Sequence, residues 1–247
     1  MLRTKRIVLL IVCNLLGAGL FYSWSSSVYG PEIQGFWPTL DSQVFFFFNG
    51  LLSENMAFRY FTAFTNLRFF DTISFLTMLG IFGWHYRKMD KAGRRWMIAM
   101  GMVILLTAVI GKQFDLAWNV ERPSPTKFFT ELGVPVLRVS ELTGWPAKDW
   151  SGSSFPGDHG MCLIIFCFYM LRYFGWRTFM AGLAVVLFFS LPRVMSGAHW
   201  VSDIAVGAVS VNLIVLSWML LTPAADKIIN WLLQKYNEKI LKGESVQ

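Results

Sequence analysis

The chain has 247 residues, of which 55% are hydrophobic and 15% are charged, and its mean hydropathy is +0.48. Soluble domains carry about 25% charged residues, so the composition excludes an ordinary soluble protein and indicates several membrane spans. The net charge of +7 does not indicate a nucleic-acid partner, because the Lys and Arg residues cluster in short segments between apolar runs.

The apolar runs predict an all-α integral membrane protein, a six-transmembrane-helix bundle in a single domain over residues 1–247. Because the first run is long enough to cross a bilayer, we expect a retained helix rather than a cleaved signal peptide. In chain order, the predicted spans are residues about 7–24, 71–86, 96–110, 159–174, 178–191 and 200–221.

Three further segments do not fit a membrane span. The aromatic segment 41–53 is too short to cross a bilayer, so a short interfacial or re-entrant helix is expected there. A long loop is expected over about 111–155. The tail, residues 224–247, has apolar residues at helical spacing, which predicts an amphipathic helix on the inner membrane surface.

The positions of the basic residues orient the predicted bundle. Most of the 22 Lys and Arg residues lie in the N-terminal segment, in 87–95, in 172–177 and in the tail. Cytoplasmic loops of membrane proteins carry an excess of Lys and Arg. Both termini are therefore predicted to be cytoplasmic, and the loop 111–155 is predicted to lie on the outer face.

Three segments on this outer face carry candidate catalytic residues: ERPSPTK (121–127), SFPGDHG (154–160) and LPRVMSGAHWVSD (191–203). In the last of them, His199 and Asp203 are four residues apart, so they share a face if the helix has begun. An aspartate that accepts the proton of one imidazole nitrogen leaves the other nitrogen free to attack phosphorus. This spacing predicts His199 as a nucleophile that Asp203 orients.

The SFPGDHG segment has the sequence of a helix start that binds phosphate. Pro156 suits the first helical turn, where its missing N–H costs nothing. The free N–H groups of Gly157, Asp158 and His159 would then point at an anion. His159 is also placed to protonate a leaving oxygen.

Two arginines complete the predicted anion site. Arg122 and Arg193 supply fork-shaped, permanently charged donors for phosphate oxygens, and such donors stabilise the charge that develops in phosphoryl transfer. The two histidines with Asp203 and Asp158 could instead ligate a metal ion. Because adjacent arginines favour an anion over a cation, we expect no metal at this site.

These segments resemble the three signature motifs of the type-2 phosphatidate phosphatase superfamily. The matching residues are Arg122-Pro123, then Pro156 with His159, then Arg193, His199 and Asp203. The resemblance implies a six-helix bundle and phosphoryl transfer that needs neither a metal nor another cofactor. It also implies a phosphohistidine intermediate on His199, with His159 as the general acid and Asp203 orienting the nucleophile.

The chain departs from the motifs of this superfamily at several positions. Asp115 stands where the family has lysine, and Lys112, one turn earlier, is the residue that could reach the phosphate instead. Gly157-Asp158 stands where the family has Ser-Gly, and Pro192 where it has serine. Two phosphate-contacting hydroxyl groups are therefore missing and a carboxylate has been added, which is unusual for an ordinary phosphatase.

Longer stretches are similar to one subgroup of the superfamily, the lipid A phosphotransferases of the Gram-negative inner membrane. These stretches include FTNLRFFD (64–71), RPSPT (122–126), RVSEL (138–142), SFPGDHGM (154–161) and PRVMSGAHW (192–200). The similarity implies transfer of the distal phosphate of undecaprenyl diphosphate to the 1-phosphate of lipid A, or Kdo2-lipid A, at the periplasmic face. Membrane lipids would surround such a protein.

The sequence leaves two other functions open. The same chemistry with water as the acceptor would make the chain an undecaprenyl-diphosphate phosphatase or a lipid A 1-phosphatase. An ion-coupled transporter is an alternative of another class, since intramembrane His and Asp residues can relay protons. The clustering of the ionisable residues at one end of the spans, rather than at mid-depth, argues against the transporter.

A phosphate acceptor adds a requirement for positive charge. The second pKa of a phosphate monoester is about 6, so the acceptor is largely dianionic and must approach a second anion. Arg68, Lys127 and Arg138 are candidate cations for this purpose. Asp158 would tether an arginine or repel a second phosphate. Arg68 and Asp71 would form an ion pair at a helix entry, or Arg68 would contact the substrate.

Overall fold

The computed structural model is all-helical and describes residues 2–29, 32–118 and 120–244. The side chains of residues 2–3, 115–116 and 239–244 are outside this description, as are residues 245–247 of the predicted tail. The long helices are α1 (Leu2–Ser25), α2 (Phe36–Glu54), α4 (Arg68–Lys88), α5 (Lys91–Trp118), α8 (Asp158–Phe174), α9 (Trp176–Met195) and α11 (Ala224–Glu244). The last apolar helix consists of η1 (Asp203–Ala208), α10 (Val209–Leu216) and η2 (Ser217–Leu221).

By length and composition, four helical segments of the described chain can cross a membrane. They are Thr4–Ser25, Lys91–Phe114, Trp176–Met195 and Asp203–Leu221. A fifth span is possible if α3 (Met56–Thr65) and α4 act together, and these two helices are bent by 67° at their junction. Helix α8 has 17 residues, which is at the lower limit for a spanning helix. The all-helical membrane fold is supported, and the count of six spans stays a prediction.

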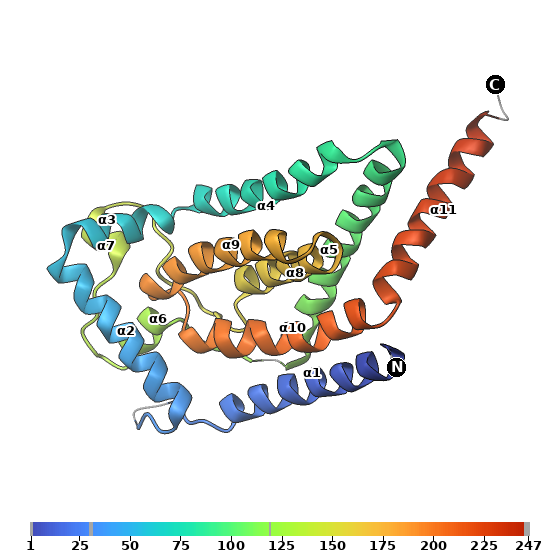
Figure 1. Ribbon diagram of the computed structural model, residues 1–247. Helices are drawn as coiled ribbons and strands as arrows, with labels where there is room; N and C mark the ends of the chain where they lie inside the picture. Colours follow the sequence, from blue (N-terminus) through green and yellow to red (C-terminus); the bar gives the residue numbers. More distant parts are fainter. Residues whose placement is uncertain (1, 30–31, 119, 245–247) are drawn as a thin grey trace.

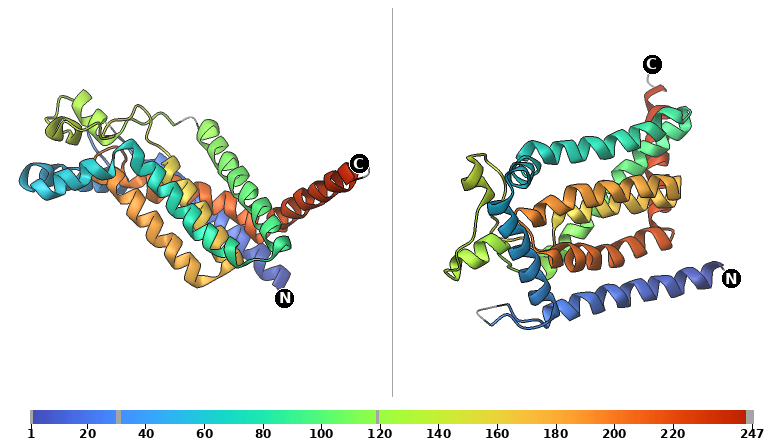
Figure 2. Two further views of the ribbon diagram at one scale, coloured as in Figure 1. Left: turned by 90° about the horizontal axis from the view of Figure 1, so that it is seen from above. Right: turned by 60° about the vertical axis from the view of Figure 1, so that its left-hand side comes forward.

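Helices α1, α4, α8, α9 and α10 run lengthwise, α5 and α11 are inclined to them, and the short elements gather at one end of the bundle (Figure 1). There, α2 runs across the ends of the lengthwise helices, next to α3, α6 (Pro125–Glu131) and α7 (Val139–Thr143) (Figure 2). Both chain termini lie at the opposite end. The predicted aromatic segment 41–53 is thus the inner part of a longer helix that crosses the bundle end.

Several helices are longer than the spans predicted for them. Helices α1, α4, α5 and α9 extend beyond their apolar runs, because polar and charged residues continue the helix at both ends. The predicted loop 111–155 begins too early, since α5 continues to Trp118, and it contains α6 and α7. Gly111 does not end α5. A Cβ atom there would lie 3.0 Å from the sulfur of Met161, so the glycine allows α5 to pack closely against α8.

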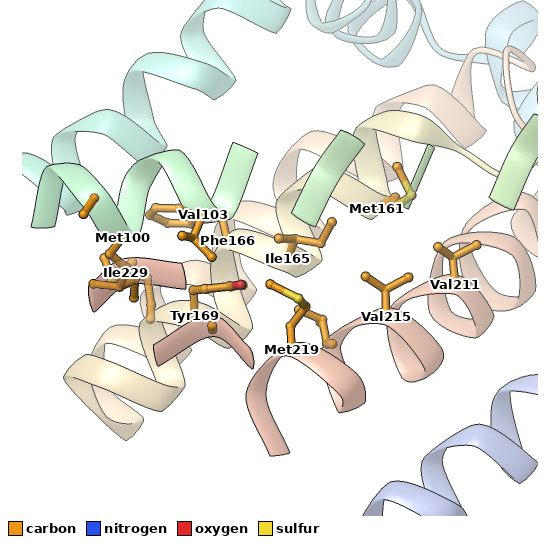
Figure 3. Packing of buried hydrophobic residues seen from close by; sticks show 14 of the residues in the cluster. Met100, Val103, Met161, Ile165, Phe166, Tyr169, Val211, Val215, Met219 and Ile229 are labelled. Atoms are coloured by element: carbon orange, nitrogen blue, oxygen red, sulfur yellow. The ribbon is translucent and has the colours of Figure 1, made fainter. Parts of the chain in front are cut away.

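The largest apolar cluster lies between α5, α8, α10 and α11 (Figure 3). One polar contact within this cluster is a hydrogen bond of 2.7 Å between the hydroxyl groups of Thr107 and Tyr169. Ile229 of α11 is fully buried in this cluster, and Ile228 and Leu232 pack against it. Part of the apolar stripe predicted for the membrane surface is therefore covered by the bundle itself.

Gly207 makes the closest contact between the last apolar helix and the loop that precedes α8. A Cβ atom on Gly207 would lie 2.7 Å from the Cα atom of Pro156. We expect Gly207→Ala to lower the free energy of unfolding by about 1–3 kcal/mol, as overpacking does. Thermal unfolding in detergent measures the effect. Gly83→Ala is the control, because nothing lies within 4 Å of a Cβ atom on Gly83, and equal stability of both variants would contradict this packing.

Candidate active site

Hydrogen bonds join the three predicted motif segments at the end of the bundle that carries α2. The backbone N–H of Ser154 donates to the carbonyl of Arg122 over 2.8 Å. The Thr126 hydroxyl donates to the carbonyl of Gly197 over 3.1 Å, and the Trp200 indole donates to the carbonyl of Pro123 over 2.8 Å. Residues far apart in the sequence are thereby held in one site.

His199 is held by Asp203 at the start of the last apolar helix. Its Nδ1 atom lies 3.3 Å from a carboxylate oxygen of Asp203, and the Asp203 side chain is completely buried. His199 itself precedes the helix, which begins at residue 201. The contact forms because the same carboxylate oxygen accepts the backbone N–H of Trp200 over 2.9 Å, as in a helix cap. The Nε2 atom of His199 is left as the free nitrogen.

Arg122 lies between two buried carboxylates. Its Nη1 atom donates to Asp203 over 2.6 Å, and its Nη2 atom donates to Asp41 over 2.7 Å. The Arg122 side chain is only 7% exposed. In the structure its guanidinium bridges Asp41 and Asp203, and its predicted role as a phosphate donor stays a prediction.

Asp41 is a site residue that the sequence reasoning missed. It lies on α2 and is 1% exposed. Besides Arg122, it accepts the Tyr29 hydroxyl over 2.9 Å and the backbone N–H of Ser202 over 2.9 Å. The available signal was a carboxylate four residues before the aromatic run Phe45–Phe48, because a carboxylate beside such a run is costly to bury without a partner.

The second histidine has a carboxylate partner of its own. The Nε2 atom of His159 lies 3.4 Å from Asp71, and the same carboxylate oxygen accepts a hydrogen bond from the buried Arg193. Each histidine therefore contacts one aspartate, and each of these aspartates also contacts an arginine. The His199 unit is buried, whereas the His159 side chain is 40% exposed.

The start of α8 differs from the prediction. The helix begins at Asp158, so Pro156 precedes it rather than occupying its first turn. The N–H of Gly157 is not free, since it donates to the carbonyl of Ser154 over 3.1 Å. Gly157 adopts a φ of 76°, and a Cβ atom there would lie 3.1 Å from the carbonyl oxygen of Asp203. Gly157 therefore allows the segment before α8 to pack closely against the backbone of Asp203.

Comparison with known proteins places this chain in a family. The PAP2 superfamily model matches residues 96–226, more than half of the chain, and this range contains both histidines and both arginines. The chain belongs to the PAP2 superfamily. It is 44% identical over 228 residues to lipid A 1-diphosphate synthase from Escherichia coli (strain K12), covering 92% of this chain and 93% of that protein. No solved structure matches.

The position at which this PAP2 chain lacks the superfamily lysine is Asp115, whose side chain lies outside the described residues. Lys112, the predicted replacement, forms an ion pair of 3.3 Å with Asp158. Both side chains are largely exposed, so the pair contributes little stability. Asp158 thus pairs with a lysine rather than with an arginine, and its alternative role of repelling a second phosphate stays a prediction.

The other predicted cations do not form ion pairs with the aspartates of the two histidine units in the described residues. Arg68 is exposed at the first residue of α4, and the predicted pair with Asp71 is replaced by the Asp71–Arg193 contact. Lys127 pairs with Glu131 over 3.6 Å, and Arg138 pairs with Glu141 over 2.8 Å and with Asp149 over 3.1 Å. The charges of Lys127 and Arg138 are therefore compensated within the outer segments, whereas the described residues show no ion pair for Arg68.

The PAP2 site has no ready cluster of metal ligands. In the described part of the chain, no three His, Cys, Asp or Glu side chains are grouped so that they could hold one metal ion. In each of the two histidine–aspartate pairs, the aspartate also contacts an arginine. This arrangement suits an anionic ligand.

Proposed function

We propose that this chain is a lipid phosphotransferase that moves the distal phosphate of undecaprenyl diphosphate to the 1-phosphate of lipid A. The observation that carries the proposal is the contact between His199 Nδ1 and the buried Asp203. This contact supports Nε2 as the attacking atom, because it engages the other ring nitrogen. The 44% identity to a lipid A 1-diphosphate synthase supports lipid A as the acceptor.

The first chemical step forms a phosphoenzyme. His199 Nε2 attacks the distal phosphorus, a nitrogen–phosphorus bond forms, and the bond to the bridging oxygen breaks. Asp203 accepts a hydrogen bond from the Nδ1–H group and stabilises the imidazole as it gains positive charge. In the second step an oxygen of the lipid A 1-phosphate attacks the same phosphorus, and the nitrogen–phosphorus bond breaks. His199 returns to its starting form and lipid A gains a diphosphate.

His159 serves the leaving group in this scheme. Its Nε2 atom lies 3.4 Å from Asp71, a contact that favours the protonated ring and would leave Nδ1–H to face the reacting oxygens in this scheme. A proton passes from His159 to the bridging oxygen as undecaprenyl phosphate leaves, and His159 regains a proton from the released phosphate or from water before the next turnover. Arg193 holds Asp71 from the other side and brings positive charge to the same place.

A cavity beside His159 fits a phosphate that carries a lipid chain. It has a volume of about 220 Å³ and lies between α4 and α8. Asp71, Asp158 and His159 form its polar end, and Phe75, Met78 and Leu163 line its apolar length. A lipid substrate would place its phosphate at the polar end and its chain along the apolar wall.

The proposal places the site at the periplasmic face of the bacterial inner membrane. Both termini and the basic α4–α5 turn lie at the end of the bundle opposite α2 (Figure 1). Excess positive charge marks the cytoplasmic side. In this orientation six segments cross the membrane: α1, α4, α5, α8, α9 and the helix that contains α10.

The fate of a labelled phosphate tests the proposal. Purified protein in detergent with a chelator receives undecaprenyl diphosphate labelled in its distal phosphate, with and without lipid A. We expect label on lipid A, and only when lipid A is present. Label released only as free phosphate while lipid A is present would contradict the transferase and identify a hydrolase.

A further inference from the structure

The carboxylates of the site outnumber the cations that contact them. Four aspartates, Asp41, Asp71, Asp158 and Asp203, face three cations, Arg122, Arg193 and Lys112. Every one of these cations already has a carboxylate partner. A phosphate dianion entering this site requires additional positive charge, because an uncompensated anion is costly to bury.

Lys148 lies in the loop before α8, and its backbone is fixed beside Arg193. Its N–H donates to the carbonyl of Asn66 over 2.9 Å, and its carbonyl accepts the Ser196 hydroxyl over 3.3 Å. The Asn66 side chain in turn donates to the carbonyl of Pro192 over 2.8 Å. Lys148 is therefore tied to residues on both sides of Arg193 in the sequence.

The charges around the Lys148 ammonium are those of the site. Lys148 is an exposed residue, but partial burial of its ammonium lowers its pKa below the ordinary value, and the neighbouring Arg193 and Arg68 lower this pKa further. Asp71 and Asp158 act on it in the opposite direction. Within the described part of the chain, the ion pairs of the site carboxylates do not include Lys148. Its charge is thus available to a ligand.

We propose that Lys148, together with Arg193, binds the phosphate that is transferred through His199, and supplies the charge that Asp115 does not. The inference rests on the proposed phosphohistidine chemistry. It assigns the phosphate-binding lysine to the outer loop, and it leaves Lys112 to hold Asp158. The ligand group is a phosphate dianion on a lipid diphosphate.

The test measures formation of phosphohistidine from labelled undecaprenyl diphosphate alone, over a range of donor concentrations. Lys148→Met keeps the apolar stem and the backbone contacts but removes the charge. A charge-assisted contact of this kind is worth about a 10- to 100-fold change, so we expect phosphoenzyme formation to slow by that factor. Lys148→Arg should recover most of the rate. Lys127→Met is the matched control, because Lys127 is on the same outer face but pairs with Glu131.

Two results would overturn the assignment. One is normal phosphoenzyme formation in Lys148→Met with slower transfer to lipid A, which would make Lys148 an acceptor residue. The other is normal rates in both steps. Thermal unfolding of each variant separates loss of charge from loss of structure. If the unmodified protein forms no phosphohistidine, the proposed function fails, independently of Lys148.

Discussion

The His199→Ala variant is expected to fold and insert normally, to form no phosphoenzyme and to transfer no phosphate to lipid A. The reason is that no other group in the site has a free nitrogen held by a buried carboxylate. Loss of a covalent nucleophile lowers turnover by at least about 10⁴-fold. Labelled donor followed by rapid quenching measures the phosphoenzyme, and thermal unfolding in detergent verifies the fold.

The third histidine of the chain provides the control for this experiment. His85 lies at the far end of α4, where its Nε2 atom is 3.0 Å from the hydroxyl of Thr178. His85→Ala should retain transfer. His159→Ala should still form the phosphoenzyme, but slowly, because only the protonation of the leaving oxygen is lost. Transfer by His199→Ala at a rate near that of the unmodified protein would refute covalent catalysis.

Asp41→Ala is expected to lower both the stability and the activity of the enzyme, although Asp41 does not touch the reacting atoms. Removing one partner of a buried ion pair costs about 3–5 kcal/mol, since it leaves a buried charge uncompensated. Arg122 would then be held by Asp203 and Ser202 without its second carboxylate. Because Asp203 also holds His199, we expect slower phosphoenzyme formation.

A second buried aspartate separates these two effects. Asp149 is 1% exposed and accepts hydrogen bonds from Arg138 and from the N–H of Ser140, but it lies outside the histidine units. Asp149→Ala should lower the midpoint of thermal unfolding in the same way. At a temperature where both variants are folded, only Asp41→Ala should slow phosphoenzyme formation. Equal rates in the two variants would show that Asp41 has a structural role alone.

The sequence predicted the helices well and their ends poorly. Hydropathy locates a helix, but residues such as Gly111 and Pro156 can lie inside a helix or outside it, depending on the residues that pack around them. A glycine is required where α5 approaches Met161, and a proline two residues before Asp158 does not start the helix. These distinctions depend on neighbours that come from other parts of the chain.

The site was predictable where its contacts are local. His199 and Asp203 are close in the sequence, and their contact was foreseen, as was the joining of the three motif segments. The partners of Arg122 were not, since Asp41 lies on α2 and no local pattern connects the two residues. Lys148 was likewise missed. Its place beside Arg193 is set by Asn66 and Ser196, which lie in other segments.

The wide sequence separation of the site residues also determines when the enzyme becomes active during its synthesis. Asp41 is delivered to the membrane early and Arg122 about midway, whereas Asp203 and His199 emerge only with the final apolar helix. Until that helix enters, Arg122 lacks its second carboxylate and the proposed nucleophile is absent. A chain arrested before residue 199 is therefore expected to be inert toward lipid phosphates, and chemical competence is expected only once insertion is nearly complete.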